Sequence, residues 1–359
     1  MAEPLYPPLG NIPGGLRRFL LEELPGLAEG IDRSNLVPGE VLDALRGYGA
    51  FNTGSLGLGG LLEAVRLASM SSPGTAHVIL VSASGSIAGG VEPGRIVALS
   101  ITEPGGGSDV KANLRTRAVE EDGRALITGV KVFTSNAVYA DYFLVLAASE
   151  SGDRLYLVER GSGVSVEPMD LSGFRGAGVG RVAYDNAPGI PVGEPGTGLK
   201  TSLQAINVGR LGYASIALGI GETSLQAAIE AGAGKIVFGE RLVDKQGPRW
   251  MLAESYVGLT TLHSLLSAAI AGASGWKVDP EAAAVAKVYG ASVARQAVWS
   301  SMQLLGGRGL ARWSLTERLW RDVRVLDIGE GAREVLLDFI ASRLVKRVLG
   351  RSRSRGEGA

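Results

Sequence analysis

The hydrophobic period changes twice along this chain of 359 residues, and that change most limits the folds open to it. In residues 1–96, apolar side chains recur at helical spacing in short runs that glycine and proline interrupt. Strand-like runs replace them in residues 97–195, and long helical patterns return in residues 196–349. We therefore predict an α+β multidomain protein. It has an N-terminal helical domain, a middle small β-barrel or sandwich, a C-terminal four-helix bundle and a flexible tail at 350–359.

The middle segment has the pattern of a compact β domain. Short β-type runs lie at 97–101, 114–119, 125–133, 142–147, 155–158 and 164–166. Asp122-Gly123 stands between the second and third runs, and an Asp-Gly pair favours the tight turn of a hairpin. Regular short strands separated by polar turns are typical of a small sandwich or barrel.

The helical segments allow two further predictions. In the first segment Leu16, Phe19, Leu20 and Leu24 follow helical spacing. Pro25-Gly26 is expected to end that helix, and a second short helix is expected near 61–68.

In the last segment Leu211, Leu218 and Leu225 recur every seven residues, beside Ala214, Gly221 and Ala228. Such a stripe predicts a helix that packs closely against its neighbours. The uncharged stretch 255–276 is predicted to be a buried helix of the same bundle.

Composition excludes several classes of site. The chain has no cysteine, which rules out disulfides, cysteine nucleophiles and thiolate metal sites. Its two histidines, His77 and His263, are not spaced as ligands, so we interpret them as packed or solvated and expect no metal site. Basic and acidic residues balance at 36 each, so no net field attracts nucleic acid or an anionic membrane. We expect a cytoplasmic protein that binds neither.

Two segments of the middle region have the composition of a ligand-binding surface. In residues 99–110 a strand runs into a Pro-Gly-Gly-Gly turn, where backbone N–H groups can approach a ligand and hydroxyls flank the turn at Thr102 and Ser108. In residues 131–136 a strand ends in Phe133 followed by two hydroxyl side chains, which suit the face and edge of a planar ring. Taken alone, either segment is more often an ordinary turn or strand end.

Together these segments resemble the middle domain of the acyl-CoA dehydrogenase family. Residues 102–109 match its Thr-Glu-Pro-Gly-x-Gly-Ser-Asp motif in full. Residues 131–136 match Lys-x-(Trp/Phe)-Ile-Thr-Asn, with Thr134 and Ser135 at the Ile-Thr positions. Further segments that resemble family motifs, in the family's order, are 238–246, 303–309 and 321–331. The chain is identified as a member of this family with a shortened N-terminal domain.

The resemblance implies that FAD is bound between the β domain and the helices. The residues expected to contact its ring and phosphates are Leu99, Ile101, Thr102, Gly107 and Ser108 on one side and Phe133, Thr134 and Ser135 on the other. The residues expected to hold the adenine-diphosphate part of FAD in a neighbouring subunit are Lys235, Phe238, Gln246, Gln303 and Gly307. The resemblance therefore also implies a homo-oligomer, a dimer or a tetramer.

The reaction that the resemblance implies is α,β-dehydrogenation of an acyl-CoA thioester, with Glu330 taking the α-proton and the flavin accepting the β-hydride. The expected substrate contacts are Ser108, Asn207, Arg210 and Gly331. In some members the base lies beside the family's recurrent arginine, but residues 207–209 before Arg210 hold no carboxylate. The alternative interpretation is that Glu330 only caps the helix that starts near Ala332.

Some departures from the family pattern bear on turnover. Gly329 stands where an aromatic residue usually precedes the glutamate, so a wall of the acyl pocket is expected to be missing. Ala332 and Arg333 replace a Thr-Ser pair that contacts FAD. The main hypothesis is a dehydrogenase of fatty acid or amino acid catabolism that reduces an electron-transfer flavoprotein or a similar acceptor. The alternative is a flavin-bound relative that acts as a binding or structural subunit.

Overall fold

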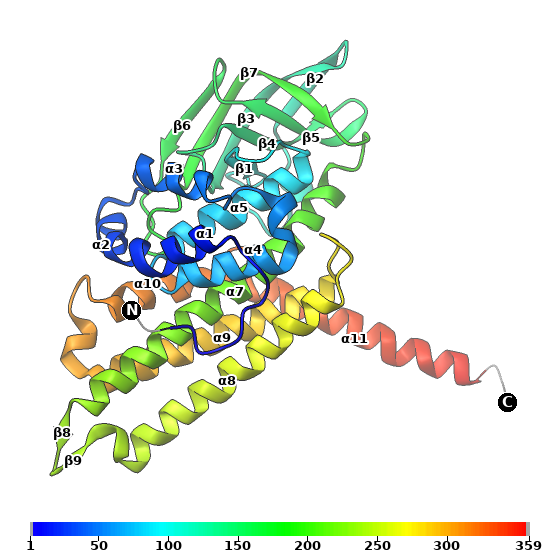
Figure 1. Cartoon of the computed structure of the whole chain (residues 1–359). Coiled ribbons are helices and arrows are strands. Elements are labelled where there is room, and N and C mark those ends of the chain that lie inside the picture. The colour runs from blue at the N-terminus through cyan, green and yellow to red at the C-terminus, as the bar shows by residue number, and fades with distance from the viewer. Residues whose placement is uncertain (1–2, 357–359) are drawn as a thin grey trace.

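The computed structural model describes the backbone of residues 3–356 and the side chains of residues 3–349. A β domain lies on one side of a layer of N-terminal helices, and long C-terminal helices lie on the other side (Figure 1). The mixed helical and β architecture predicted from the sequence is confirmed. Across residues 3–356, no helix combines the length and apolar character needed to cross a membrane.

The N-terminal layer contains longer helices than the sequence pattern predicted. Its elements are α1 Gly14–Arg18, the π-helical turn η1 Phe19–Glu23, α2 Leu24–Ser34, α3 Gly39–Gly47, α4 Thr53–Ser69 and α5 Pro73–Gly89. The prediction that Pro25-Gly26 ends the first helix was wrong. Pro25 occupies the first turn of α2, where its missing N–H leaves no hydrogen bond unmade, and the π-helical turn before it keeps the path helical.

The middle domain is a seven-stranded sheet that closes on itself. Its strands are β1 Val97–Ser100, β2 Arg117–Glu121, β3 Arg124–Thr134, β4 Tyr142–Ser149, β5 Gly152–Glu159, β6 Val164–Pro168 and β7 Gly180–Val192, with the short helix α6 Val110–Asn113 before β2. The order β1-β4-β2-β3-β7-β5 closes because β4 also pairs with β5. The predicted hairpin at Asp122-Gly123 joins β2 to β3, whereas β7 was not predicted.

The C-terminal region is a bundle of long helices with one helix that projects from it. Its elements are α7 Gly198–Ala233, β8 Ile236–Val237, β9 Glu240–Arg241, η2 Leu242–Asp244, α8 Gln246–Ala271, α9 Pro280–Leu305, η3 Gly306–Leu310, α10 Leu315–Ile328 and α11 Arg333–Gly356. The helices α7, α8, α9 and α10 pack together, while α11 contacts α9 and then extends away (Figure 1). The tail expected from residue 350 is helical as far as Gly356, and residues 357–359 lie outside the described residues.

Two uncharged stretches differ in how they are buried. Residues 73–86 of α5 are buried on every side, between α4, α7 and the strand β1. Helix α8 buries only Ser255, Leu259, Leu262 and Leu266, which follow helical spacing on one face. The prediction of a buried helix at 255–276 therefore holds for one face of α8 only.

Glycines on α7 allow its neighbours to approach its backbone. A Cβ atom at Gly212 would lie 2.2 Å from Leu80 Cδ1 of α5. At Gly219 it would lie 2.2 Å from Ser69 Oγ and 2.3 Å from the carbonyl oxygen of Arg66 in α4. At Gly221 it would lie 2.3 Å from Leu259 Cδ2 of α8. Three helices thus meet α7 at distances that only glycine permits.

A buried ionic network fixes the N-terminal segment where α4 crosses α7. The Nε atom of Arg66 lies 2.6 Å from Glu222 Oε1, and its Nη1 atom lies 3.2 Å from Glu63 Oε2. Arg66 also donates to the carbonyl oxygens of Tyr6 and Pro7. All three charged side chains are almost fully buried, and their ion pairs and hydrogen bonds offset part of the cost of their lost hydration.

We expect Gly219→Ala to lower the free energy of unfolding by about 1 to 3 kcal/mol, because the new methyl group would collide with the backbone of Arg66. Gly30→Ala is the matched control, since Gly30 lies inside α2 with open space around it. It should be neutral or stabilising by about 0.5 to 1 kcal/mol. Denaturant unfolding of both variants checks this. Equal effects at the two positions would contradict the close-packing argument.

Candidate active site

The two predicted segments of the β domain are joined by a buried ion pair that the sequence did not reveal. Lys131 Nζ lies 2.9 Å from Glu103 Oε1 and 3.0 Å from the carbonyl oxygen of Ile101. Burial lowers the pKa of Lys131 to about 8. Burial alone would raise the pKa of Glu103, but hydrogen bonds from Lys131 and Thr116 bring it below its usual value. These two motif residues are buried and hold the two segments together from inside the β domain.

Asn136, which ends the second segment, links it to the helices. Its Nδ2 atom lies 3.1 Å from the carbonyl oxygens of both Val78 in α5 and Val97 in β1. Phe133 and Asn136 both have positive φ values, 53° and 63°. The strand therefore turns sharply here, and Phe133 is left 57% exposed while its neighbours stay partly or fully buried.

The predicted flavin-contact residues around the glycine turn lie together at the end of β1 and β3. The backbone N–H of Val132 donates to the carbonyl oxygen of Thr102, which brings the two segments side by side. A Cβ atom at Gly107 would lie 3.2 Å from Thr102 Oγ1, so the turn folds over the threonine. Gly107 and Ser108 are exposed, and Leu99 and Thr102 are partly exposed.

Two of the predicted contact residues are turned inward. Thr134 is buried, and its hydroxyl lies 3.2 Å from Ser100 Oγ inside the β domain. Ile101 is 9% exposed and belongs to a small apolar cluster. Their side chains therefore shape this surface from behind.

Ser135 is held by a residue that the sequence gave no reason to place here. Its hydroxyl lies 2.8 Å from His77 Nε2 of α5. His77 is buried, and burial lowers its pKa to about 4, so the imidazole is neutral at physiological pH. His77 and Ser135 are 58 positions apart, and no sequence spacing links them. The interpretation of His77 as a packed side chain is correct, but it is packed against the predicted site.

Glu330 lies between α10 and α11 and faces α7. Its backbone is in the left-handed region, with φ 56°, and its carbonyl oxygen accepts a hydrogen bond from Arg210 Nε at 3.1 Å. Arg210 also donates to Asn207 Oδ1 at 2.8 Å. A Cβ atom at Gly209 would lie 2.5 Å from Glu330 Oε2, so the carboxylate rests on the bare backbone of α7. The structure therefore brings Glu330, Arg210 and Asn207 together.

The surroundings of Glu330 favour a carboxylate that can accept a proton near neutral pH. Burial raises its pKa to about 7, while Arg210 and Lys287 oppose that rise. Lys287 Nζ donates to the carbonyl oxygen of Gly331 at 2.7 Å, which fixes the turn after Glu330. Among the described residues, none donates a hydrogen bond to the Glu330 carboxylate, so a capping role has no support from the side-chain geometry.

The residues predicted to hold the adenine-diphosphate part of FAD lie at the opposite end of the bundle from the β domain. They belong to the β8–β9 hairpin, the start of α8 and the end of α9 with η3 (Figure 1). The five exposed residues are Lys235, Phe238, Gln246, Gln303 and Gly307. The two sets of predicted FAD residues therefore lie apart from each other within this chain (Figure 1).

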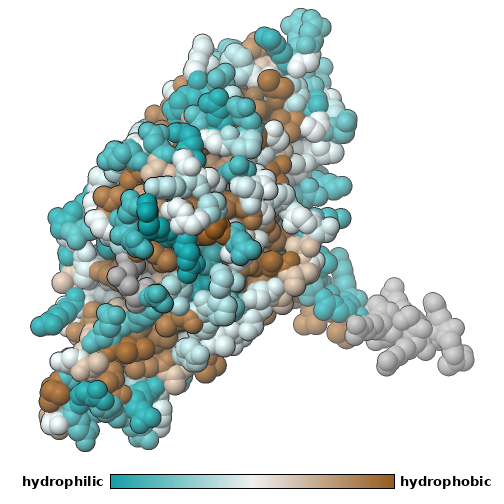
Figure 2. Space-filling model, viewed as in Figure 1, coloured by the Kyte–Doolittle hydropathy of each residue, from teal (hydrophilic) through white to brown (hydrophobic). Residues whose placement is uncertain are grey.

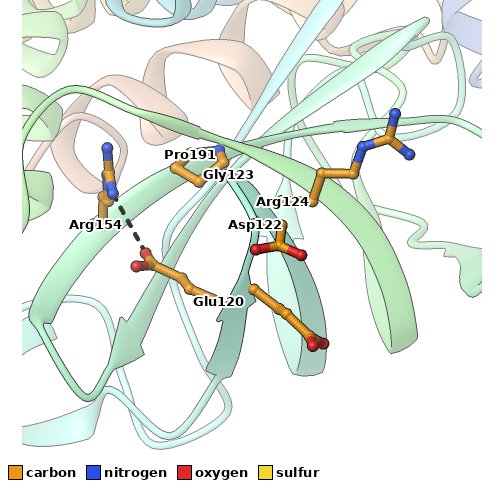
Figure 3. A pocket seen from close by; sticks show the side chains of 7 residues that line it. Glu120, Asp122, Gly123, Arg124, Arg154 and Pro191 are labelled. Carbon is orange, nitrogen blue, oxygen red and sulfur yellow. Dashed lines mark hydrogen bonds and ion pairs between the residues drawn. The ribbon is translucent and has the colours of Figure 1, made fainter.

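Two surface hollows differ in their relation to this site. One, of about 280 Å³, lies at the tip of the β2–β3 hairpin and is lined by acidic residues and by Arg124 and Arg154 (Figure 3). It includes none of the predicted site residues. The other, of about 470 Å³, lies beside Asn207 and is lined in part by Lys111 and Lys200.

Comparison with known proteins places the chain in a family. Residues 98–187 match the family described as acyl-CoA dehydrogenase, middle domain, and residues 196–345 match acyl-CoA dehydrogenase, C-terminal domain. An acyl-CoA dehydrogenase of Bacillus subtilis is 31% identical over 69% of this chain and 68% of its own length. The human mitochondrial short-chain specific acyl-CoA dehydrogenase is 27% identical over 92% of this chain and 88% of its own length.

The overall fold is also similar to that of a solved acyl-CoA dehydrogenase. The structure of butyryl-CoA dehydrogenase from Megasphaera elsdenii superposes with a TM-score of 0.88 over 96% of this chain and 100% of that chain, at 23% identity. The fold and site thus define a helical and β protein of the acyl-CoA dehydrogenase type. The chain belongs to the acyl-CoA dehydrogenase family and is an oxidoreductase of that type.

We expect Glu330→Gln to stabilise the protein, and more so as pH rises. The folded-state pKa of Glu330, about 7, exceeds the ordinary value of 4.5. The folded state therefore retains this proton at pH values where the unfolded state releases it, so wild-type stability falls between about pH 4.5 and 7. The variant lacks this loss and should gain about 1 to 3 kcal/mol relative to wild type at pH 8.

Denaturant unfolding at pH 5 and pH 8 measures this difference, with both proteins carrying the same cofactor load. Asp338→Asn, at an exposed position on α11, is the control for loss of a surface carboxylate. A stability difference that is the same at both pH values would contradict a raised pKa for Glu330.

Proposed function

We propose that this chain dehydrogenates an acyl-CoA thioester between its α- and β-carbons, with Glu330 as the base. The observation that carries the proposal is the Glu330 carboxylate on Gly209, beside Arg210 and with a pKa near neutral. The carboxylate takes the α-proton, and the β-carbon loses a hydride, so the substrate loses two electrons and gains a C=C bond. Bound FAD would supply the oxidant for that hydride.

The residues at the end of β1 and β3 fit a flavin. Phe133 offers an exposed apolar face, and the hydroxyls of Thr102, Ser108 and Ser135 offer hydrogen bonds at its edge. A planar ring with polar atoms on its rim matches this combination. The proposed contacts from one chain are Leu99, Thr102, Gly107, Ser108, Phe133 and Ser135, with the inward-facing Ile101 and Thr134 supporting that surface from behind; those from a neighbouring chain are Lys235, Phe238, Gln246, Gln303 and Gly307.

The substrate is proposed to contact Ser108, Asn207, Arg210 and Gly331. The backbone N–H of Glu330 would donate to the thioester oxygen, where negative charge develops as the α-proton leaves. The hollow beside Asn207 is lined by Lys111, Lys200 and Asp153, and its two lysines would suit the phosphates of a CoA tail. Arg210 positions the site, because its guanidinium donates hydrogen bonds to both Asn207 Oδ1 and the carbonyl oxygen of Glu330.

One departure from the family pattern has a structural consequence. Arg333 donates to the carbonyl oxygen of Val288 and to Ser292 Oγ, both in α9. It therefore anchors the start of α11 to the bundle and is committed to this role. The family's Thr-Ser pair at these positions contacts FAD through its hydroxyls. Ala332 and Arg333 have no hydroxyl, and Arg333 instead binds α9.

We also propose a homo-oligomer that passes electrons to an electron-transfer flavoprotein or a similar acceptor. The proposed FAD contacts form two groups that lie at opposite ends of the chain's structure, and this separation supports a site shared by two chains. Hydrophobic patches are visible on the face of the molecule that Figure 2 shows. Exposed large apolar side chains of the C-terminal helical region include Trp250, Val257, Trp299, Leu310, Trp320, Val335, Leu337 and Leu344. Such a surface is typical of subunit interfaces.

Anaerobic mixing of the purified FAD-loaded protein with a panel of acyl-CoA thioesters tests the proposal. We expect the flavin absorbance to bleach in wild type and to bleach about 100 to 10,000 times more slowly in Glu330→Gln, because the base is lost. Glu334→Gln is the matched control, since that exposed carboxylate lies four residues after Glu330, in the first turn of α11. It should bleach at the wild-type rate.

Bound FAD that no thioester bleaches would contradict the dehydrogenase proposal and favour a binding or structural role. Equal rates in wild type and Glu330→Gln would remove Glu330 from the mechanism while leaving the reaction in place.

A further inference from the structure

We infer that Tyr213 supplies the aromatic wall that Gly329 cannot, and that Tyr213, Phe174 and His77 close the acyl end of the site so that it accepts short acyl groups. This inference rests on the proposed function, because it concerns the acyl chain of the same substrate. It assigns the specificity of the site to α5, α7 and the loop between β6 and β7.

Tyr213 fills the space that a side chain at position 329 would need. A Cβ atom at Gly329 would lie 2.2 Å from Tyr213 Oη and 2.8 Å from its Cζ. Real Cβ atoms do not approach other atoms this closely, so an aromatic residue at 329 would force the packed ring of Tyr213 to move. The expectation that Gly329 leaves a wall missing is therefore corrected: a ring is present, but it comes from α7.

The ring of Tyr213 belongs to a buried cluster of three rings. Its centroid lies 5.5 Å from that of His77 and 5.7 Å from that of Phe174, and His77 and Phe174 are 5.4 Å apart. Each ring contacts the other two, and all three side chains are buried. At one end His77 is bonded to Ser135, and at the other Tyr213 contacts the backbone before Glu330. The cluster thus bridges the proposed flavin side and the proposed base.

In the proposed function the α-carbon would lie at Glu330 and the β-carbon would lie toward Ser135. The acyl carbons beyond them would then meet the rings that connect those two points. Next to Tyr213, helices α5 and α7 are in close contact, since a Cβ atom at Gly212 would lie 2.2 Å from Leu80 Cδ1. A long chain would have to displace packed rings or separate α5 from α7, and both are costly.

The cluster is held in place by hydrogen bonds at its edges. The backbone N–H of Phe174 donates to the buried Asp322 Oδ1 at 2.6 Å, which fixes the loop to α10. His77 is fixed through Ser135. Tyr213 does not compete with Glu330 as a base, because burial and the nearby charge of Glu330 raise its pKa well above the usual value. Its contribution is the volume of its ring.

Calorimetric binding of redox-inert thioether analogues of acyl-CoA to the FAD-loaded protein tests the inference without turnover. With chains of four to sixteen carbons, we expect wild type to bind the shortest analogues best and to lose at least about tenfold in affinity by twelve carbons. Tyr213→Ala, and the bulkier Tyr213→Leu if the first variant folds poorly, should improve binding of the ten-carbon analogue relative to the four-carbon one by about tenfold, since each buried methylene adds several-fold.

Tyr213→Phe is the matched control, because it keeps the ring and loses only the hydroxyl. It should keep the wild-type preference. Equal affinity of wild type for four and sixteen carbons, or an unchanged preference in folded Tyr213→Ala and Tyr213→Leu, would overturn the inference. If no analogue of any length binds although FAD is present, the proposed function itself fails. Glu330-dependent bleaching by long-chain thioesters would leave the function standing and remove only the length limit.

The exchange between positions 213 and 329 has its own test. Gly329→Tyr alone should lower the thermal midpoint of unfolding by about 5 °C or more, because two rings would occupy one space. Adding Tyr213→Ile should recover most of that loss. A fully tolerated Gly329→Tyr, or a double variant no more stable than the single one, would show that Tyr213 does not occupy the place of the missing aromatic residue.

Discussion

The close approach of other elements to the backbone of α7 is the constraint on which the structure depends. Gly212 admits Leu80 of α5, Gly219 admits the backbone of α4, and Gly221 admits Leu259 of α8. Because α7 runs for 36 residues, these contacts join the N-terminal layer and the bundle into one core. Larger residues at these positions would separate the layers, and the lost dispersion contacts would not be recovered elsewhere.

The proposed chemistry uses the same device. Gly209 lies on α7 one turn before Gly212, and its bare backbone accepts the Glu330 carboxylate. Burial against this helix surface removes water from the carboxylate and raises its pKa. Arg210, the residue after Gly209, holds the backbone of Glu330 in place through a hydrogen bond to its carbonyl oxygen. Tyr213 follows within the same turn and fills the volume over Gly329. One short stretch of α7 therefore sets both the basicity of Glu330 and the shape beside it.

Local pattern predicted the order of helices, strands and helices, the Asp122-Gly123 hairpin and the close-packed stripe on α7, because these follow from short-range periodicity and turn chemistry. It failed at Pro25, where a π-helical turn keeps the path helical. It also missed β7, whose glycines and prolines resemble a loop until β3, β5 and β6 supply hydrogen-bond partners. Such partners lie outside any sequence window.

For the candidate site, the sequence by itself determined the family, the two β-domain segments and the presence of Glu330, Arg210 and Asn207, since motifs record residue types and order. Only the tertiary structure decided which of these residues face outward. It turned Glu103, Lys131 and Thr134 into internal supports and brought His77 to Ser135. It also placed Tyr213 against Gly329, a contact between positions 116 residues apart in the sequence. Packing decides such contacts, because an aromatic ring can fill the space beside Gly329 either from position 329 itself or, as here, from Tyr213 on α7.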